Sequence, residues 1–220
     1  MRPSPAPTSA LRRGLSLAAA ACVALPATLL QARERLRPTP SQTEGPFYPT
    51  ELPADHDGDL LRTGSASYAL GEPAWVEGSV RAVDGEALAG AWVEIWQCDA
   101  QGRYHHPAER GRADPAFQGF GRVSTDAQGR YRFRTIRPAP YSGRTPHIHL
   151  KVRLGKHELL TTQLYVQGDP GNERDFLWRR LSPRDQQALT VPFVRRGDAW
   201  RADFPLVVEA CPRRPGPARP

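Results

Sequence analysis

Cysteine is scarce in this sequence, which limits the metal sites and the redox chemistry to expect. The 220 residues contain three cysteines, Cys22, Cys98 and Cys211, and no CxxC pair. Closely spaced cysteines are the usual sign of a zinc–thiolate site, so such a site is not expected. In an exported protein Cys98 and Cys211 could form a disulfide, but one pair of thiols does not decide this.

Strong charge of one sign is lacking as well. Residues 1–32 contain three arginines and no acidic residue, so the formal net charge of +7 falls to +4 for the rest of the chain. This excess is spread along the sequence, and the arginine pairs at 179–180 and 195–196 are interpreted as solvated side chains. Nucleic-acid binding is therefore not expected.

One long apolar run is present, near the N-terminus. Residues 12–32, RRGLSLAAAACVALPATLLQA, begin with two arginines and continue as an alanine-rich stretch. This is the pattern of an export signal with Ala32 as the cleavage residue, and RRGL resembles a twin-arginine leader. We expect export to the periplasm or the exterior by that route. Two alternatives stay open: an uncleaved membrane anchor, because Leu30 is an imperfect cleavage signal, and a lipid anchor at Cys22.

The sequence after the leader predicts a single domain rich in loops. Residues 33–42 are polar and contain prolines, which predicts an extended arm; residues 43–209 predict the folded domain; residues 210–220 predict a disordered Pro/Arg tail. The 23 prolines and 19 glycines are many for a helical bundle and favour a β protein.

Alternation of apolar and polar residues predicts several short strands. In RYRFRTI, Tyr131 and Phe133 alternate with arginines, which predicts one strand. The segments HIHLKVRL and ELLTTQLYV predict two more strands joined by a tight turn, and FPLVVEA predicts a last strand. Asp84-Gly85 separates two alternating stretches and predicts a hairpin between them. SPRDQQAL predicts a short helix with Ser182 as its N-cap. The fold class is therefore all-β, a sandwich (or a barrel) of short, mostly antiparallel strands with long loops and one or two short helices.

Two histidines separated by one residue, His147 and His149, raise the question of a metal site. Alternate residues of a strand face the same side, so both imidazoles could reach one ion. This pattern alone is weak, and the sequence has no HExxH motif and no glutamate four or five residues after His149. Tyr141 ends the nearby segment RPAPY, where two prolines stiffen the chain before the strand begins.

The hexapeptide DAQGRY occurs twice, at 99–104 and at 126–131, and ends each time in a tyrosine. The shared Asp-x-x-Gly is turn chemistry. Tyr131 lies in an alternating strand and is predicted to be core. Tyr104 precedes the loop HHPAERGRADP and lies at a strand end, where sites are often built. The adjacent His105 and His106 face opposite ways on an extended chain, so both cannot easily join Tyr104.

Four segments in order, VEIWQCDAQGRYHH, GRVSTDAQGRYRFRTIRPAPY, RTPHIHLKV and LTTQLYVQGDP, resemble the intradiol ring-cleavage dioxygenase family, close to its protocatechuate 3,4-dioxygenase branch. The resemblance extends from about Thr43 to Val208. It implies an oxidoreductase that inserts both atoms of O2 into a catechol-type diol and opens the ring to a cis,cis-muconic acid. It also implies one mononuclear non-haem Fe(III), with these metal ligands: Tyr104, Tyr141, His147 and His149.

The resemblance also implies roles for single residues. Tyr141 would give way when substrate binds and is thus catalytic, Arg144 would bind substrate and stabilise negative charge on the ring, and Gln163 would line the substrate pocket. The chemistry is consistent, because hard phenolate oxygens favour Fe(III) over Fe(II). Two tyrosinates and one hydroxide would balance its three positive charges.

The sequence departs from the family in ways that leave some questions open. Only Ser142 and Gly143 separate Tyr141 from Arg144, fewer residues than in protocatechuate enzymes, which predicts a more open pocket and a different catechol as substrate. The alternative function is an exported β-sandwich module that binds a catechol or a metal without turnover. A membrane partner is expected only if the leader stays uncleaved, and a homo-oligomer is left open.

Overall fold

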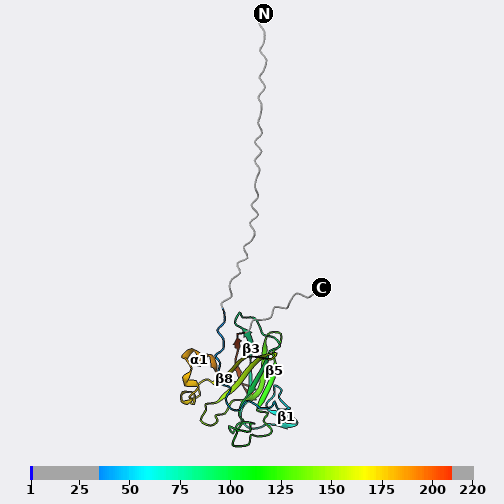
Figure 1. Ribbon diagram of the computed structural model, residues 1–220, viewed down its shortest axis with the longest axis vertical. Coiled ribbons are helices and arrows are strands. Elements are labelled where there is room, and N and C mark those ends of the chain that lie inside the picture. The colour runs from blue at the N-terminus through cyan, green and yellow to red at the C-terminus, as the bar shows by residue number, and fades with distance from the viewer. Residues whose placement is uncertain (2–34, 210–220) are drawn as a thin grey trace. The chain divides into compact units, whose positions relative to one another are not determined.

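The computed structural model describes Met1 and residues 35–209. It is a β-sandwich, as the sequence predicted (Figure 1). Two five-stranded sheets enclose the main apolar core. The first sheet contains β3 (Pro73–Ala82), β6 (Arg130–Ile136), β10 (Val194–Arg196), β11 (Ala199–Asp203) and β12 (Leu206–Val208). The second has the order β5 (Phe120–Ser124), β4 (Trp92–Trp96), β7 (His147–Leu154), β8 (His157–Val166) and β9 (Thr190–Val191). The remaining elements are short: β1 (Arg62–Thr63), β2 (Ala66–Ser67), α1 (Pro183–Leu189) and two 3-10 turns at Asn172–Arg174 and Trp178–Arg180.

Alternation along the strands sorts side chains as predicted. Tyr131 and Phe133 on β6 are buried in the core, while Arg130 and Arg132, which alternate with them, are exposed. Most strand pairs are antiparallel, and the parallel pairs are β11 with β3, β12 with β3, and β8 with β9.

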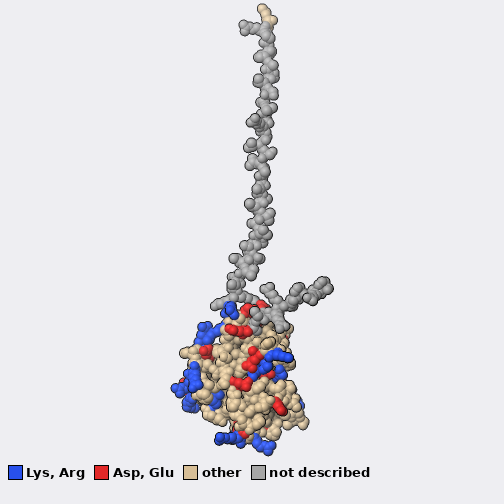
Figure 2. All heavy atoms as spheres, in the orientation of Figure 1, with Lys and Arg blue, Asp and Glu red and all other residues tan. Residues whose placement is uncertain are grey.

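On the face seen in Figure 2, acidic and basic side chains lie among one another.

Local signals in the sequence placed several elements correctly. Strands β7 and β8 follow the predicted segments, and Gly155 in the turn between them has a φ of +58°. Helix α1 begins after Ser182, whose hydroxyl accepts a hydrogen bond from the backbone N–H of Asp185. This is the predicted N-cap.

The predicted hairpin between the stretches on either side of Asp84-Gly85 is wrong. The turn does reverse the chain, and Arg81 pairs with Ala87 directly after it. The chain then crosses to the other sheet, so that β3 and β4 are not neighbours. Turn chemistry fixes only the local reversal, whereas burial of the apolar face of β4 determines which sheet it joins.

The segment before the sandwich runs along its surface without forming an element of its own. The backbone N–H of Leu36 donates to Val83, that of Thr39 to Val207 and that of Gln42 to Thr161. The predicted leader and C-terminal tail lie outside the described residues, as does Cys211, so the open question of a disulfide with the buried Cys98 is not tested. Within the described part of the chain, no helix is both long and apolar enough to cross a membrane.

Candidate functional site

The four predicted metal ligands lie together. Tyr104 comes from the long loop after β4, Tyr141 lies in the segment between β6 and β7, and His147 and His149 project from the start of β7. The ring centroids of Tyr104 and Tyr141 are 4.9 Å apart, those of Tyr141 and His147 5.3 Å, and those of His147 and His149 4.8 Å. All four side chains are buried, with Tyr141 the most exposed at 8%.

The two imidazoles are neutral and their Nε2 atoms face each other. Burial and the nearby Arg144 cation lower the pKa of His147 to about 3. For His149, burial has the larger effect and the neighbouring His147 the next, and together they lower its pKa well below the ordinary value. The Nδ1 of His147 lies 2.7 Å from the carbonyl oxygen of Thr145. Because a carbonyl only accepts, Nδ1 carries the proton and Nε2 has a free lone pair.

This arrangement leaves buried hydrogen-bonding capacity unused. The Nε2 atoms of His147 and His149 are 3.2 Å apart, and the Nδ1 of His149 has no hydrogen-bond partner among the described residues. The buried hydroxyl of Tyr104 also lacks a hydrogen bond of good geometry there, although the Tyr141 side chain is its polar neighbour. Unpaired buried polar atoms are rare, and a cation held between the two Nε2 atoms and the tyrosine oxygens would give the Tyr104 hydroxyl oxygen a partner.

The tyrosines are uncharged without a metal. Burial raises the pKa of Tyr104 well above its ordinary value, and the neighbouring Tyr141 adds to this effect. Burial also raises the pKa of Tyr141, while the Arg144 cation opposes it. A cation that binds here would have to displace two phenolic protons, as strongly charged metals do for water and thiols.

The donor set fits a ferric ion better than zinc. Within the described residues, no group of three or more His, Cys, Asp or Glu side chains could hold a metal. A cation between His147 and His149 would therefore depend on the tyrosine oxygens. Anionic phenolates are hard ligands and match a small trivalent ion, so the residues present fit Fe(III).

Arg144 is held next to the tyrosines by an acidic residue that the sequence did not single out. Its Nε donates to Asp175 at 2.7 Å, and one terminal nitrogen donates to the Gln163 side chain at 2.8 Å. Burial lowers the pKa of Arg144, but the hydrogen bond to Asp175 and the negative charge of that carboxylate, with smaller contributions from Tyr165 and Tyr141, together outweigh it, and the pKa is raised. The guanidinium is therefore a fixed positive charge at the predicted catalytic position.

Gln163 is also oriented on several sides. Its amide nitrogen donates to the carbonyl of Thr43, and its oxygen accepts from Arg144 and from the Tyr165 hydroxyl. The structure thus brings both predicted substrate-binding residues to the same side of the tyrosine–histidine cluster.

A two-residue turn connects Tyr141 to Arg144. Ser142 and Gly143 have φ values of +43° and +76°, and the backbone N–H of Arg144 donates to the Tyr141 carbonyl at 2.7 Å. Positive φ at both central residues is typical of the mirror-image type I′ turn. Among the described residues Ser142 is the one non-glycine with positive φ, which indicates strain at the site.

Aromatic side chains enclose the cluster. The Trp96 ring lies parallel to that of His149, with centroids 4.8 Å apart and planes within 9°, and Phe47 stacks on Tyr104 at 4.6 Å. Beside Tyr104 lies a mostly apolar cavity of about 440 Å³, bounded by Phe47, Trp96, Phe117 and Phe120 among others. Trp96 and Phe47 were not predicted as site residues, although Trp96 lies in one of the segments that carry the family resemblance.

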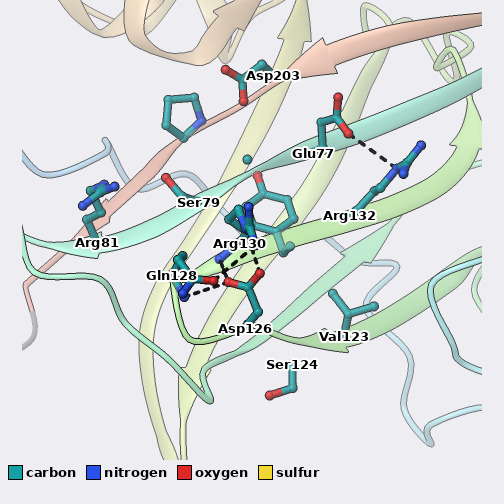
Figure 3. A pocket seen from close by; sticks show the side chains of 13 residues that line it. Glu77, Ser79, Arg81, Val123, Ser124, Asp126, Gln128, Arg130, Arg132 and Asp203 are labelled. Atoms are coloured by element: carbon teal, nitrogen blue, oxygen red, sulfur yellow. Dashed lines mark hydrogen bonds and ion pairs between the residues drawn. The ribbon is translucent and has the colours of Figure 1, made fainter.

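Other candidate positions lie outside the cluster. His105 Nε2 contacts the Asp114 carbonyl, and His106 Nδ1 accepts from the backbone N–H of Ala108. A hollow of about 880 Å³ lies over β3 and β6, where Arg130 pairs with Asp126 and Arg132 with Glu77 (Figure 3). It contains none of the predicted site residues.

Comparison with known proteins reveals one consistent set of relatives. The profile of the dioxygenase family described as "Dioxygenase" matches residues 43–196. The chain is 38% identical over 199 residues to the protocatechuate 3,4-dioxygenase beta chain of Burkholderia cepacia, covering 82% of this chain and 81% of that one. It is 31% identical over 183 residues to catechol 1,2-dioxygenase 2 of Acinetobacter lwoffii, covering 75% of this chain but 62% of the relative.

Solved structures agree with this similarity. The dioxygenase domain of a dioxygenase–carbohydrate-binding protein fusion from Streptomyces sp. SirexAA-E superposes with a TM-score of 0.64 at 32% identity, over 80% of this chain and all of that one. Catechol 1,2-dioxygenase from Acinetobacter sp. ADP1 superposes with a TM-score of 0.59 at 28% identity, over 77% of this chain and 62% of the relative.

Proposed function

The chain belongs to the intradiol ring-cleavage dioxygenase family, and we propose that it binds one non-haem Fe(III) and cleaves a catechol-type diol to a cis,cis-muconic acid. In this reaction the carbon–carbon bond between the two hydroxyl-bearing carbons breaks, and each atom of O2 ends in one of the two new carboxyl groups. The observation that carries the proposal is the buried cluster of two phenols and two neutral imidazoles beside a fixed arginine.

Tyr104, Tyr141, His147 and His149 would hold the metal. A ferric ion held there would supply the electron-withdrawing charge that makes a diol ring reactive toward O2. The protein would keep His147 oriented through the Thr145 carbonyl and keep bulk water away, since all four side chains are buried. A dry site strengthens the electrostatic interactions within it.

Tyr141 and Arg144 would perform the remaining chemistry. Tyr141 is the most exposed of the four proposed ligands and adjoins Arg144. We therefore expect its Oη atom to take up a proton from the incoming diol. The Arg144 guanidinium would stabilise negative charge that develops on the ring as O2 attacks. Gln163, fixed by Thr43 and Tyr165, would orient the diol by hydrogen bonding.

The visible absorption spectrum of the purified protein tests this function. We expect a tyrosinate-to-iron charge-transfer band with one iron per chain, a shift of the band when catechol is added, and its recovery as oxygen is consumed. Zinc or copper bound stoichiometrically to a colourless protein would overturn the ligand assignment. A coloured protein that shifts with catechol but consumes no oxygen would instead indicate a binding module.

We also propose that the enzyme acts outside the cytoplasm. The support is the arginine pair and apolar run of residues 12–32. In a bacterium with a twin-arginine pathway, the double variant Arg12→Lys, Arg13→Lys should move oxygen-consuming activity from the periplasmic to the cytoplasmic fraction. Equal fractionation of the variant and the parent chain would rule out that route.

A further inference from the structure

Two buried charged residues next to the site have no role in the proposed chemistry. Glu94 on β4 and Lys151 on β7 are cross-strand partners, and only 1% and 3% of each residue is exposed. Trp96 and His149 are the next pair along the same face of the two strands. Burying charge is costly unless the group is paired, and an apolar pair would serve the sheet as well. These charges therefore call for partners outside the strands.

Both charges have partners in Thr43–Tyr48, here called the covering segment. Lys151 Nζ forms an ion pair with Glu44 and lies 3.8 Å from the ring centroid of Tyr48. The Tyr48 hydroxyl donates to Glu94 at 2.8 Å. Glu94 also pairs with Arg122 at 3.2 Å, so its charge is balanced. Both ends of the covering segment are thus anchored on this one pair of strands.

The residues between the two anchors touch proposed metal ligands. Gly45 adopts a φ of +73°, and a Cβ there would lie 3.4 Å from the Cε1 of His149. Phe47 stacks on Tyr104 with planes within 18° and meets the Tyr141 ring edge-on at 5.7 Å. The anchors therefore fix the position of the wall that covers the tyrosine–histidine cluster.

We propose that Lys151 and Glu94 are positioning residues, which clamp the covering segment over the cluster and thereby keep Tyr104 and His149 in place. The inference rests on the proposed function for its catalytic consequence, but the clamp itself is a property of the metal-free protein. Neither residue is one of the proposed metal ligands or substrate-binding residues. They act through Glu44 and Tyr48.

A matched pair of surface carboxylates tests the clamp. Glu44 and Glu158 both pair with Lys151 Nζ, and their side chains are equally accessible at 44% and 45%, but only Glu44 belongs to the covering segment. We expect Glu44→Ala to increase amide hydrogen exchange across residues 42–48 by about tenfold or more in the metal-free protein, because local opening needs only these contacts to break. Glu158→Ala should leave that exchange within about twofold of the parent.

The loaded enzyme provides a second readout. Glu44→Ala and Lys151→Met should shift the tyrosinate absorption band and lower kcat by about tenfold or more, because small misplacements of reacting groups are costly. Lys151→Arg, which keeps the positive charge, should keep the band position and the kcat of the parent. Equal effects of Glu44→Ala and Glu158→Ala on exchange, or no effect of either, would overturn the clamp. If the parent chain consumed no oxygen, the proposed function would fail, and the exchange experiment would still decide the clamp.

Discussion

Tyr104→Phe is expected to abolish the iron chromophore and to lower turnover more than about 100-fold, since even changes around metal ligands cost roughly 10–100-fold. The substitution removes only the hydroxyl that lacks a good hydrogen bond in the described structure, so the fold should tolerate it. The stack with Phe47 and the contact with Tyr141 need only the ring. Iron content, the visible spectrum and oxygen uptake measure the effect.

Tyr131→Phe is the matched control, because Tyr131 ends the second copy of the same hexapeptide. Its hydroxyl donates to the Phe204 carbonyl at 2.5 Å, far from the cluster. Removing the hydroxyl leaves a buried acceptor unpaired and should cost about 1–3 kcal/mol of unfolding free energy, while iron content and colour persist. Loss of iron from the Tyr131 variant, or its retention in the Tyr104 variant, would contradict the assignment of ligands.

Arg144→Lys should lower kcat by about 10- to 100-fold while the charge-transfer band remains. This loss in kcat is somewhat smaller than the roughly 10²–10³-fold cost of removing a charge-stabilising donor outright. Lysine keeps a positive charge beside the buried Asp175, so the acid does not lose its counter-ion. It loses the planar fork that reaches Asp175 and Gln163 at once. Steady-state oxygen uptake separates the effect on kcat from the effect on KM.

Arg134→Lys provides the control for Arg144→Lys. Arg134 also pairs with an aspartate, Asp59, at 3.1 Å, but it lies on β6 away from the cluster. Its substitution should leave kcat within about twofold, because a partly exposed ion pair contributes little. A kcat of the Arg144 variant close to that of the parent would show that a diffuse positive charge suffices and that the fork has no role.

The sequence predicted those parts of the fold that depend on neighbouring residues. Alternation located β6, β7 and β8, and Ser182 marked the start of α1. Strand pairing depends on contacts between distant residues, and here the prediction around Asp84-Gly85 was wrong. The parallel pairing of β11 and β12 with β3 was not predicted either, since nothing local to those segments encodes it.

In the candidate site, too, the sequence predicted what depends on neighbouring residues and missed contacts between distant ones. The spacing of His147 and His149 is local and visible in the sequence. For Tyr104 the residues alone indicated only a position at a strand end, and the family resemblance was needed to predict it as a ligand. Asp175 gave no signal because it meets Arg144 across 31 residues of chain. Phe47 reaches Tyr104 from the segment before the sandwich, and single-sequence patterns do not predict that contact.

The two-residue turn at Ser142-Gly143 has a consequence for how substrate range can change in this family. Two residues are the shortest common connection for a hairpin. In this chain a Cβ at Gly143 would meet no atom within 4 Å, so inserted residues would extend into open space. The turn between Tyr141 and Arg144 can therefore lengthen by insertion while the strand carrying His147 and His149 keeps its register. The proposed metal ligands and the turn beside them can, in this sense, evolve separately.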